Sequence, residues 1–440
     1  MEATAKKATF QKYSAYKDSG EYWMGLIPKH WELKKLKHVF QEKKKVTNPE
    51  LPCGSISYGK VVYKDDEKIP ESTKASYQEV LAGEFLINPL NLNYDLVSLR
   101  IGLSQINVVV SSGYIVLKNV IELDKSYFNY LLHRYDVAYM KLLGSGVRQT
   151  ISFNHIANSL LAFPPLPEQT AIAAFLDDKT AKIDRAIAHK EKMISLLKER
   201  KQIIIQNAVT KGLDPNAKMK HSGVEWIGEI PEGWEVKRLK FLGNIYSGIS
   251  GKSGEDFSKE NNGSMKPFVP FTNICNNLKI DVDQYQYVRI SESENQNRVK
   301  KCDLLFLMSS ETLEDIAKNS IYLGDDQELY LNSFCKGFRL HSDRALPEYV
   351  NYLLYSKPYR DYFSLVGRGF TRINLKQEYI NDVYTILPPI EEQTAIVSFI
   401  EAQYTKVDKA IKLQGHQIEK LKELKSTLID SAVTGKIKVS

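Results

Sequence analysis

The chain contains two copies of one unit, and this duplication limits its fold more than any other feature of the sequence. Residues 16–37 and 219–240 are identical at 12 of 22 positions. Residues 163–177 and 387–401 are identical at eight of 15 positions. Two matches of this density in the same order indicate a tandem repeat of one structural unit.

Each copy has the same internal order. An opening segment rich in aromatic residues, Pro and Gly is followed by a variable middle and then by a long helical pattern that starts after Pro-Pro. The middles contain β-branched runs such as 106–118 and 300–308, which predict strands. The four residues Asn-Tyr-Leu-Leu recur at 129–132 and 351–354. These patterns predict two similar α/β domains within an α+β chain.

The helical patterns are expected to open at Glu168-Gln169 and Glu392-Gln393 and to cover about 44 residues, or roughly 66 Å each. Eight apolar positions recur 224 residues apart, in steps typical of a coiled coil. Three stripe positions are polar in both copies. We expect the two helices to pack together; packing of each helix on its own domain alone is the alternative. The apolar pairs are Ile172/Ile396, Leu176/Ile400, Ile183/Val407, Ile187/Ile411, Ile194/Ile418, Leu197/Leu421, Ile204/Leu428 and Ala208/Ala432, and the polar pairs are Lys179/Gln403, Lys190/Gln414 and Lys201/Lys425.

Composition favours a globular protein of a reducing, cytoplasmic setting. The 440 residues include 10% aromatics and no apolar run of bilayer length, and the four cysteines have no paired spacing. The lysines near the start precede no apolar core, so we expect no signal peptide. The net charge of +7 is uneven, with eleven lysines against five acids in residues 1–45. A polyanionic partner and a solvated basic tail both explain this excess.

Catalytic motifs are incomplete wherever they begin. The Gly-Lys-Ser at 251–253 is part of a phosphate-binding motif that also needs a glycine five residues before Gly251. Tyr246 stands at that position instead. The segment 87–95 has Leu90 and Asn91 where amino-methyltransferases carry proline and an aromatic residue. The eight histidines lack metal-ligand spacing. We therefore expect no catalytic and no metal-ligating residues, and a binding protein; a short nuclease carboxylate cluster is the alternative left open.

Two sets of residues are candidates for DNA contact. A basic trio follows each opening segment and could neutralise phosphates, although ordinary surface lysines also explain it. A loop with glycine, arginine and short polar groups precedes each Pro-Pro, and its Arg, Gln and Asn side chains are types that read base edges; a plain turn is the alternative. The trios are Lys34, Lys35 and Lys37 with Lys237, Arg238 and Lys240, and the loop residues are Ser145, Arg148, Gln149 and Thr150 with Arg368, Thr371, Arg372 and Asn374.

The combination of motifs resembles the specificity (S) subunits of type I restriction-modification systems over essentially the whole chain. The resemblance rests on the opening segments at 19–32 and 222–235, on Pro-Pro…Glu-Gln…Ala-Ile at 164–172 and 388–396, and on the Ala-Val-Thr helix ends. It implies two target-recognition domains, separated by a pair of long antiparallel coiled-coil helices that act as a ruler in a pseudo-two-fold repeat. It also implies that the chain binds a bipartite DNA target, with one half-site for each domain, and directs adenine methylation and restriction by partner subunits.

The resemblance gives the segments their expected identities. They are a basic N-terminal segment (1–20), recognition domain 1 (21–167), spacer helix 1 (168–212), recognition domain 2 (213–390), and spacer helix 2 with the C-terminus (391–440). The partners are two modification subunits and the restriction subunits, which are expected to bind S-adenosylmethionine, ATP and Mg²⁺, so that this chain binds no cofactor. A structural coiled-coil scaffold and a self-contained DNA-modifying enzyme are the alternatives.

Apolar residues outside the helical stripe predict where modification subunits dock, because exposed apolar side chains on a helix pair often mark an interface. Burial of the phenylalanines at the junction between domain and helix is the alternative. The residues are Phe175, Ile203, Ile205, Phe399 and Ile429.

Overall fold

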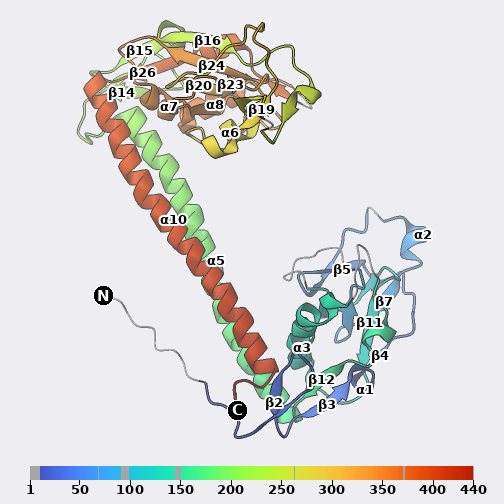
Figure 1. The fold of residues 1–440 in the computed structure, drawn as a ribbon. Coiled ribbons are helices and arrows are strands. Elements are labelled where there is room, and N and C mark those ends of the chain that lie inside the picture. Colours follow the sequence, from blue (N-terminus) through green and yellow to red (C-terminus); the bar gives the residue numbers. More distant parts are fainter. Residues whose placement is uncertain are drawn as a thin grey trace. The chain divides into compact units, whose positions relative to one another are not determined.

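The computed structural model describes residues 10–67, 69–90, 99–143, 150–261, 263–369 and 372–439. It divides the chain into two compact units, formed by residues 1–191 with 416–440 and by residues 192–415. Each unit contains one variable middle and part of both long helices, α5 (Leu166–Lys211) and α10 (Ile390–Val433) (Figure 1). The sequence-based division placed each long helix in a segment of its own, whereas the contacts group each end of a helix with the domain it packs against.

Unit 1 is built around a four-stranded antiparallel sheet of order β4-β11-β8-β9. In its register, Leu117 lies between Glu42 and Phe85. Every residue of the central strands Phe85–Ile87 and Leu304–Leu307 is fully buried, which explains their unbroken apolar sequence. The elements are β1 (Tyr16–Asp18), β2 (Leu26–Pro28), β3 (Glu32–Lys35), α1 (Leu36–Val39), β4 (Phe40–Glu42), β5 (Gly54–Ser57), β6 (Lys60–Tyr63), α2 (Glu71–Lys74), β7 (Gln78–Val80), β8 (Phe85–Ile87), β9 (Ile101–Leu103), β10 (Val108–Val110), β11 (Ile115–Asn119), α3 (Lys125–Ala138), η1 (Met140–Leu142), α4 (Phe153–Ile156) and β12 (Leu160–Phe163).

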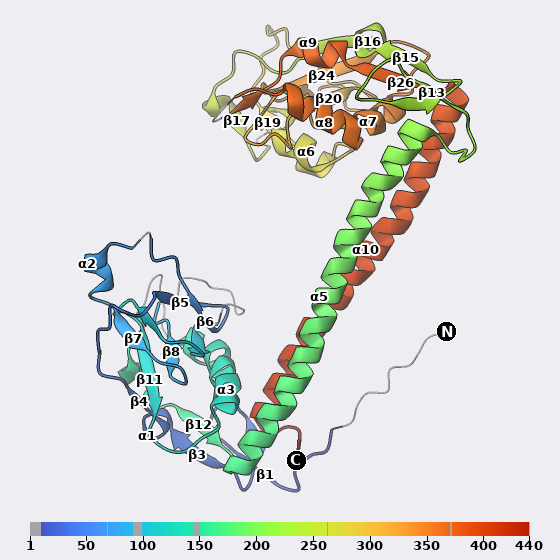
Figure 2. The ribbon, with the colours of Figure 1, turned by 180° about the vertical axis from the view of Figure 1, so that it is seen from behind.

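Helix α3 joins this sheet to the long helices. Its N-terminus is capped by Asp124, whose carboxylate accepts a hydrogen bond from the backbone N–H of Tyr127 at 2.9 Å. Figures 1 and 2 both show α3 between the sheet and the helix pair. The Tyr130 hydroxyl donates to Asp177 on α5 at 2.8 Å, and the Tyr127 hydroxyl donates to the carbonyl of Val433 on α10 at 3.2 Å. One helix thus contacts both long helices.

Unit 2 repeats this arrangement. Its sheet has the order β16-β24-β20-β22, and a second four-stranded sheet, β17-β19-β18-β23, comes from the longer middle of this copy. Helix α7 replaces α3, and its Tyr349 hydroxyl donates to the carbonyl of Val209 on α5 at 3.2 Å. The elements are β13 (Met219–His221), β14 (Glu229–Pro231), β15 (Glu235–Arg238), η2 (Leu239–Phe241), β16 (Gly243–Ser247), η3 (Gly254–Asp256), β17 (Phe257–Ser258), β18 (Lys266–Val269), α6 (Phe271–Asn276), η4 (Val282–Gln284), β19 (Gln286–Val288), β20 (Leu304–Leu307), β21 (Ser309–Ser310), β22 (Asn319–Ile321), β23 (Tyr330–Leu331), β24 (Cys335–Leu340), α7 (Pro347–Tyr355), α8 (Lys357–Val366), β25 (Ile373–Asn374), α9 (Gln377–Asp382) and β26 (Tyr384–Leu387).

Helices α5 and α10 run antiparallel within each unit, as the sequence predicts. All sixteen stripe residues named above are buried or half-buried. The polar stripe lysines make the same interhelical ion pair twice: Lys425 lies 2.7 Å from Asp184 in unit 1, and Lys201 lies 2.8 Å from Asp408 in unit 2. Because these lysines and aspartates are 224 residues apart in sequence, the ion pairs are equivalent. Such pairs favour one register of the helices over others.

The repeated Glu-Gln motif fastens each long helix to its domain. The indole N–H of Trp31 donates to Glu168 at 3.0 Å, and that of Trp234 donates to Glu392 at 3.2 Å. The following glutamines are fully buried. Gln393 accepts a hydrogen bond from the backbone N–H of Leu346 at 2.8 Å and donates to the Pro388 carbonyl at 2.8 Å.

The same contacts occur in unit 1, where Gln169 accepts from the N–H of Asp124 at 2.9 Å and donates to the Pro164 carbonyl at 2.8 Å. Each helix therefore starts at a hydrogen-bonded junction rather than at a free end.

No helix among the described residues is long and apolar enough to cross a bilayer.

Replacing Gln393 with alanine should lower the free energy of unfolding of unit 2 by roughly 2–4 kcal/mol, because buried backbone groups lose their partners. Hydrogen–deuterium exchange with mass spectrometry in urea reports the two units separately. Gln169→Ala should produce the same loss in unit 1, and Thr394→Ala, at an exposed neighbour, should change neither unit. Equal exchange in Gln393→Ala and the unmodified chain would contradict the role assigned to this junction.

Candidate nucleic-acid interface

The predicted basic trios lie at the same place in both units, on or just after strands that lead into the domain. Strand β3 pairs antiparallel with β12, and β15 pairs antiparallel with β26. In unit 1 the ammonium of Lys34 lies 3.9 Å from the ring centre of Phe163 and 3.2 Å from Glu32. Lys35 and Lys37 are exposed. They are the residues of this trio best placed to meet a phosphate.

Neighbouring carboxylates neutralise the positive charges of the basic trio in unit 2. Lys237 lies 2.9 Å from Glu235, and Lys240 lies 2.7 Å from Asp382. Arg238 also approaches Asp382, at 3.4 Å, and donates to the Tyr384 hydroxyl at 3.1 Å. The hydrogen bond from Lys240 lowers the pKa of Asp382, so this carboxylate stays charged. DNA contact by this trio stays a prediction, and it would require exchange of these ion pairs for phosphates.

The two polar loops return to the framework at equivalent points. Thr150 forms a β-bridge with Leu90, and Asn374 in β25 pairs with Ser309 in β21. Thr150 and Asn374 are 224 residues apart in sequence, and both are exposed. Of the other candidates in these loops, Ser145, Arg148, Gln149 and Thr371 lie outside the described residues.

The arginines of the second loop have different surroundings. The guanidinium of Arg368 donates to the carbonyls of Leu365 and Gly367, so it closes the C-terminal end of α8. The guanidinium of Arg372 lies 4.3 Å from the ring centre of Phe334, which is 50% exposed. An exposed cation on an exposed aromatic ring is an arrangement on which nucleic-acid bases stack. Arg372 therefore fits a base-contacting role better than Arg368.

A cavity of about 270 Å³ adjoins this pair and adds groups that the sequence did not single out. Besides the predicted Asn374, the lining includes Phe334 and Lys336, and the ammonium of Lys336 donates to the Ser247 hydroxyl at 3.0 Å. These side chains offer donors and acceptors for base edges. Phe334 immediately precedes β24 and Lys336 is its second residue; both lie about 40 residues before Arg372, and no local pattern marks them.

The apolar helix residues differ in exposure. Ile203 and Phe399 are 49% and 39% exposed, whereas Phe175 is half-buried with its ring 5.8 Å from that of Phe10. Ile429 is half-buried against the core of unit 1. The prediction that Ile205 is exposed is wrong: it is fully buried, because recognition domain 2 covers that face of α5.

Among the described residues, no three His, Cys, Asp or Glu side chains gather where they could hold a metal ion. The candidate interface described above consists of cations, amides, hydroxyls and the exposed ring of Phe334. This chemistry suits binding to a polyanion with readable edges.

Comparison with known proteins gives one consistent family. The model of the type I restriction modification DNA specificity domain matches residues 28–194 and 231–423. The type I restriction enzyme MjaVIII specificity subunit of Methanocaldococcus jannaschii is 23% identical over 94% of both chains. The EcoKI specificity subunit of Escherichia coli is 25% identical over 63% of this chain and 57% of its own length.

Two solved structures share the fold. A chain from a study of complex assembly and conformational transition of the type I R-M system has a TM-score of 0.67 at 17% identity, covering 92% of this chain and 98% of its own. The HsdS subunit of Thermoanaerobacter tengcongensis has a TM-score of 0.50 at 17% identity, covering 93% of this chain and 98% of its own.

Replacing Arg372 with alanine should weaken binding to a cognate DNA by about 1–3 kcal/mol and relax the preference at one base pair, because a base contact discriminates between sequences. Fluorescence anisotropy with a set of single-substitution duplexes measures both effects. Arg344→Ala, which removes an exposed arginine paired with Glu235, is the matched control. An equal loss on every sequence would identify Arg372 as a phosphate contact instead.

Proposed function

Because the chain belongs to the type I restriction modification DNA specificity family, we propose that it recognises a bipartite DNA target, with one half-site read by each domain. The observation that carries this proposal is the duplication itself: the family model matches both copies, and both copies have the same sheet order and helix junction. A duplicated reader suits a DNA site with two parts, since paired modules read paired half-sites.

Each domain joins a shared framework to a different reading surface. The framework contacts through Trp, Glu and Gln are equivalent in both units, whereas the middles differ in length and sequence. Arg372, Phe334 and Asn374 are the residues we assign to reading in unit 2. The equivalent surface of unit 1 would include Thr150 and the loop before it.

Catalysis belongs to the partner subunits in this proposal. The chain directs adenine methylation and restriction, while two modification subunits bind S-adenosylmethionine and the restriction subunits bind ATP and Mg²⁺. The incomplete catalytic motifs at 87–95 and 251–253 support a chain that binds without catalysing. The two long helices would set the distance between the half-sites.

Exchanging residues 33–162 for the matching segment of another family member should change one half of the target and leave the other half unchanged. The reason is that the exchanged segment contains the variable middle of unit 1 and none of the middle of unit 2. Mapping of methylated adenines in cells that express the chimera with its partner subunits measures the result. A change in both half-sites would contradict independent reading, and methylation without sequence preference would contradict the proposed function.

Phe399 is the most suitable site for testing the modification-subunit surface. Its side chain is 39% exposed on α10, whereas its equivalent Phe175 is partly covered by Phe10. Phe399→Asp should reduce copurification of the modification subunit at least tenfold. A charge placed in an apolar contact should weaken the binding free energy by more than about 1.4 kcal/mol.

Leu365→Asp is the control for this variant. Leu365 is 72% exposed on α8 of the same unit, and its substitution should leave copurification unchanged. Circular dichroism checks that both variants stay folded. Full copurification of a folded Phe399→Asp chain would exclude this face as the docking surface.

A further inference from the structure

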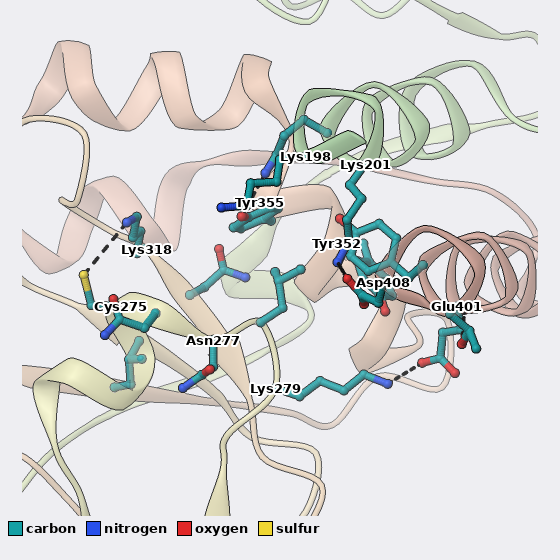
Figure 3. A pocket seen from close by; sticks show the side chains of 17 residues that line it. Lys198, Lys201, Cys275, Asn277, Lys279, Lys318, Tyr352, Tyr355, Glu401 and Asp408 are labelled. Atoms are coloured by element: carbon teal, nitrogen blue, oxygen red, sulfur yellow. Dashed lines mark hydrogen bonds and ion pairs between the residues drawn. The ribbon is translucent and has the colours of Figure 1, made fainter. Parts of the chain in front are cut away.

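Unit 2 contains a cavity of about 770 Å³ where its recognition domain meets the two long helices. Figure 3 shows lysines around it on several sides: Lys198 and Lys201 project from α5, while Lys279 and Lys318 belong to the recognition domain. Tyr352 and Tyr355 of α7 also line it, and the Tyr355 hydroxyl accepts a hydrogen bond from Gln202 of α5 at 2.9 Å. None of these residues belongs to the basic trios or polar loops described above.

The lysines outnumber the acids of this cavity. Lys201 lies 2.8 Å from Asp408, and Lys279 lies 2.6 Å from Glu401; these are the two carboxylates in the wall. Lys198 makes no ion pair with any residue that the structure describes. With four lysines and two carboxylates, the wall has a net positive charge and one uncommitted ammonium group.

Lys318, the fourth lysine of the wall, keeps its positive charge. Burial alone would lower the pKa of Lys318, but the hydrogen bond with Asp315 and the charge interactions with Cys275, Asp315 and Tyr355 together outweigh it, and the pKa is raised. The ammonium of Lys201 is also held in place, since it lies 4.0 Å from the ring centre of Tyr404. The cations are therefore positioned before any ligand arrives.

The cavity also has an unsatisfied polar atom. Asn319 lines the wall and is 1% exposed. Its amide nitrogen donates to Asn351, but its Oδ1 has no hydrogen-bond partner among the described residues. A buried acceptor without a partner costs about 1–3 kcal/mol. A phosphodiester has no hydrogen-bond donor, so a water that donates both to the ligand and to Asn319 Oδ1 would remove this cost.

Unit 1 has other side chains, or other ion-pair partners for the same side chain, at the equivalent positions. Lys198 corresponds to Lys422, which pairs with Glu419 at 3.0 Å. Lys318 and Arg100 each precede the edge strand of the equivalent sheets, and the Arg100 guanidinium lies 2.9 Å from the fully buried Asp136. Tyr355 corresponds to His133. The cationic wall is thus a property of unit 2 and not of the shared framework.

We propose that this cavity binds a phosphate group of the DNA backbone beside the half-site read by recognition domain 2. The inference rests on the proposed function and adds a contact made by a long helix. Lys198, Asn276 and Lys279 are exposed, so the cavity has an open rim that a continuous phosphodiester chain can cross. A free phosphate compound shares the same chemistry, and the experiment separates the two sources.

Lys198→Gln should weaken DNA binding about threefold to fivefold at 0.1 M salt, the size of one exposed ion pair. The slope of log K against log salt should fall by about 0.9, as expected for one lost phosphate contact. The ratio of cognate to mismatched affinity should stay constant, because a phosphate contact carries no sequence information. Anisotropy is measured on the full chain assembled with its modification subunits, with cognate and single-mismatch duplexes over a salt series.

Lys422→Gln is the matched control, because Lys422 occupies the equivalent position on α10 and should leave affinity and slope unchanged. If the slope of log K against log salt is unchanged in Lys198→Gln, the inference is overturned. The proposed function still stands in that case, provided that the complex keeps its sequence preference. Absence of any sequence preference in the unmodified complex would instead contradict the proposed function.

Calorimetric titration with inorganic phosphate separates the two sources of phosphate. If Lys198→Gln abolishes binding of inorganic phosphate but leaves DNA binding unchanged, the cavity belongs to free phosphate and the inference is overturned.

Discussion

The hydrogen-bonded junction at the start of each long helix is the constraint on which the rest of the structure depends. In unit 1, Glu168 accepts hydrogen bonds from Trp31 at 3.0 Å, from Tyr13 at 3.0 Å, and shares one with His30 at 2.6 Å. Burial would raise the pKa of Glu168, but these hydrogen bonds outweigh it and hold the pKa below its usual value. A carboxylate that stays charged at a helix N-terminus also interacts favourably with the helix dipole. The junction therefore orients the helix from its first turn.

This junction allows the reading surfaces to vary without loss of the fold. The framework hydrogen bonds of Gln169 and Gln393 end on backbone groups, which any sequence in the middle can supply. The long helices are held in register by two equivalent ion pairs that lie away from the loops. A change in the loop around Arg372 consequently alters what is contacted, while the position of the loop on the framework is kept by the pairing of Asn374 with Ser309.

Much of the framework could be predicted from the sequence, but less of the candidate interface could be. The apolar stripe and the Glu-Gln motif recur in the sequence, so their pairing and their place at a helix start follow from periodicity and repetition. The neutralisation of Lys240 by Asp382 could not be predicted, because 142 residues separate them and only strand pairing brings them together. The burial of Ile205 was missed for a similar reason, since a helical pattern does not say which further faces a domain covers.

The sequence by itself determined that the chain is duplicated, that each copy ends in a long helix with one apolar face, and which family it resembles. These properties are local or periodic, so residues close in sequence are enough to express them. Tertiary structure decided which charges remain available to a partner. Lys198 lines a cationic cavity only because folding brings Lys279 and Lys318, which are 81 and 120 residues away in sequence, to the same wall. The availability of a charge depends on the side chains that folding brings within a few ångströms of it.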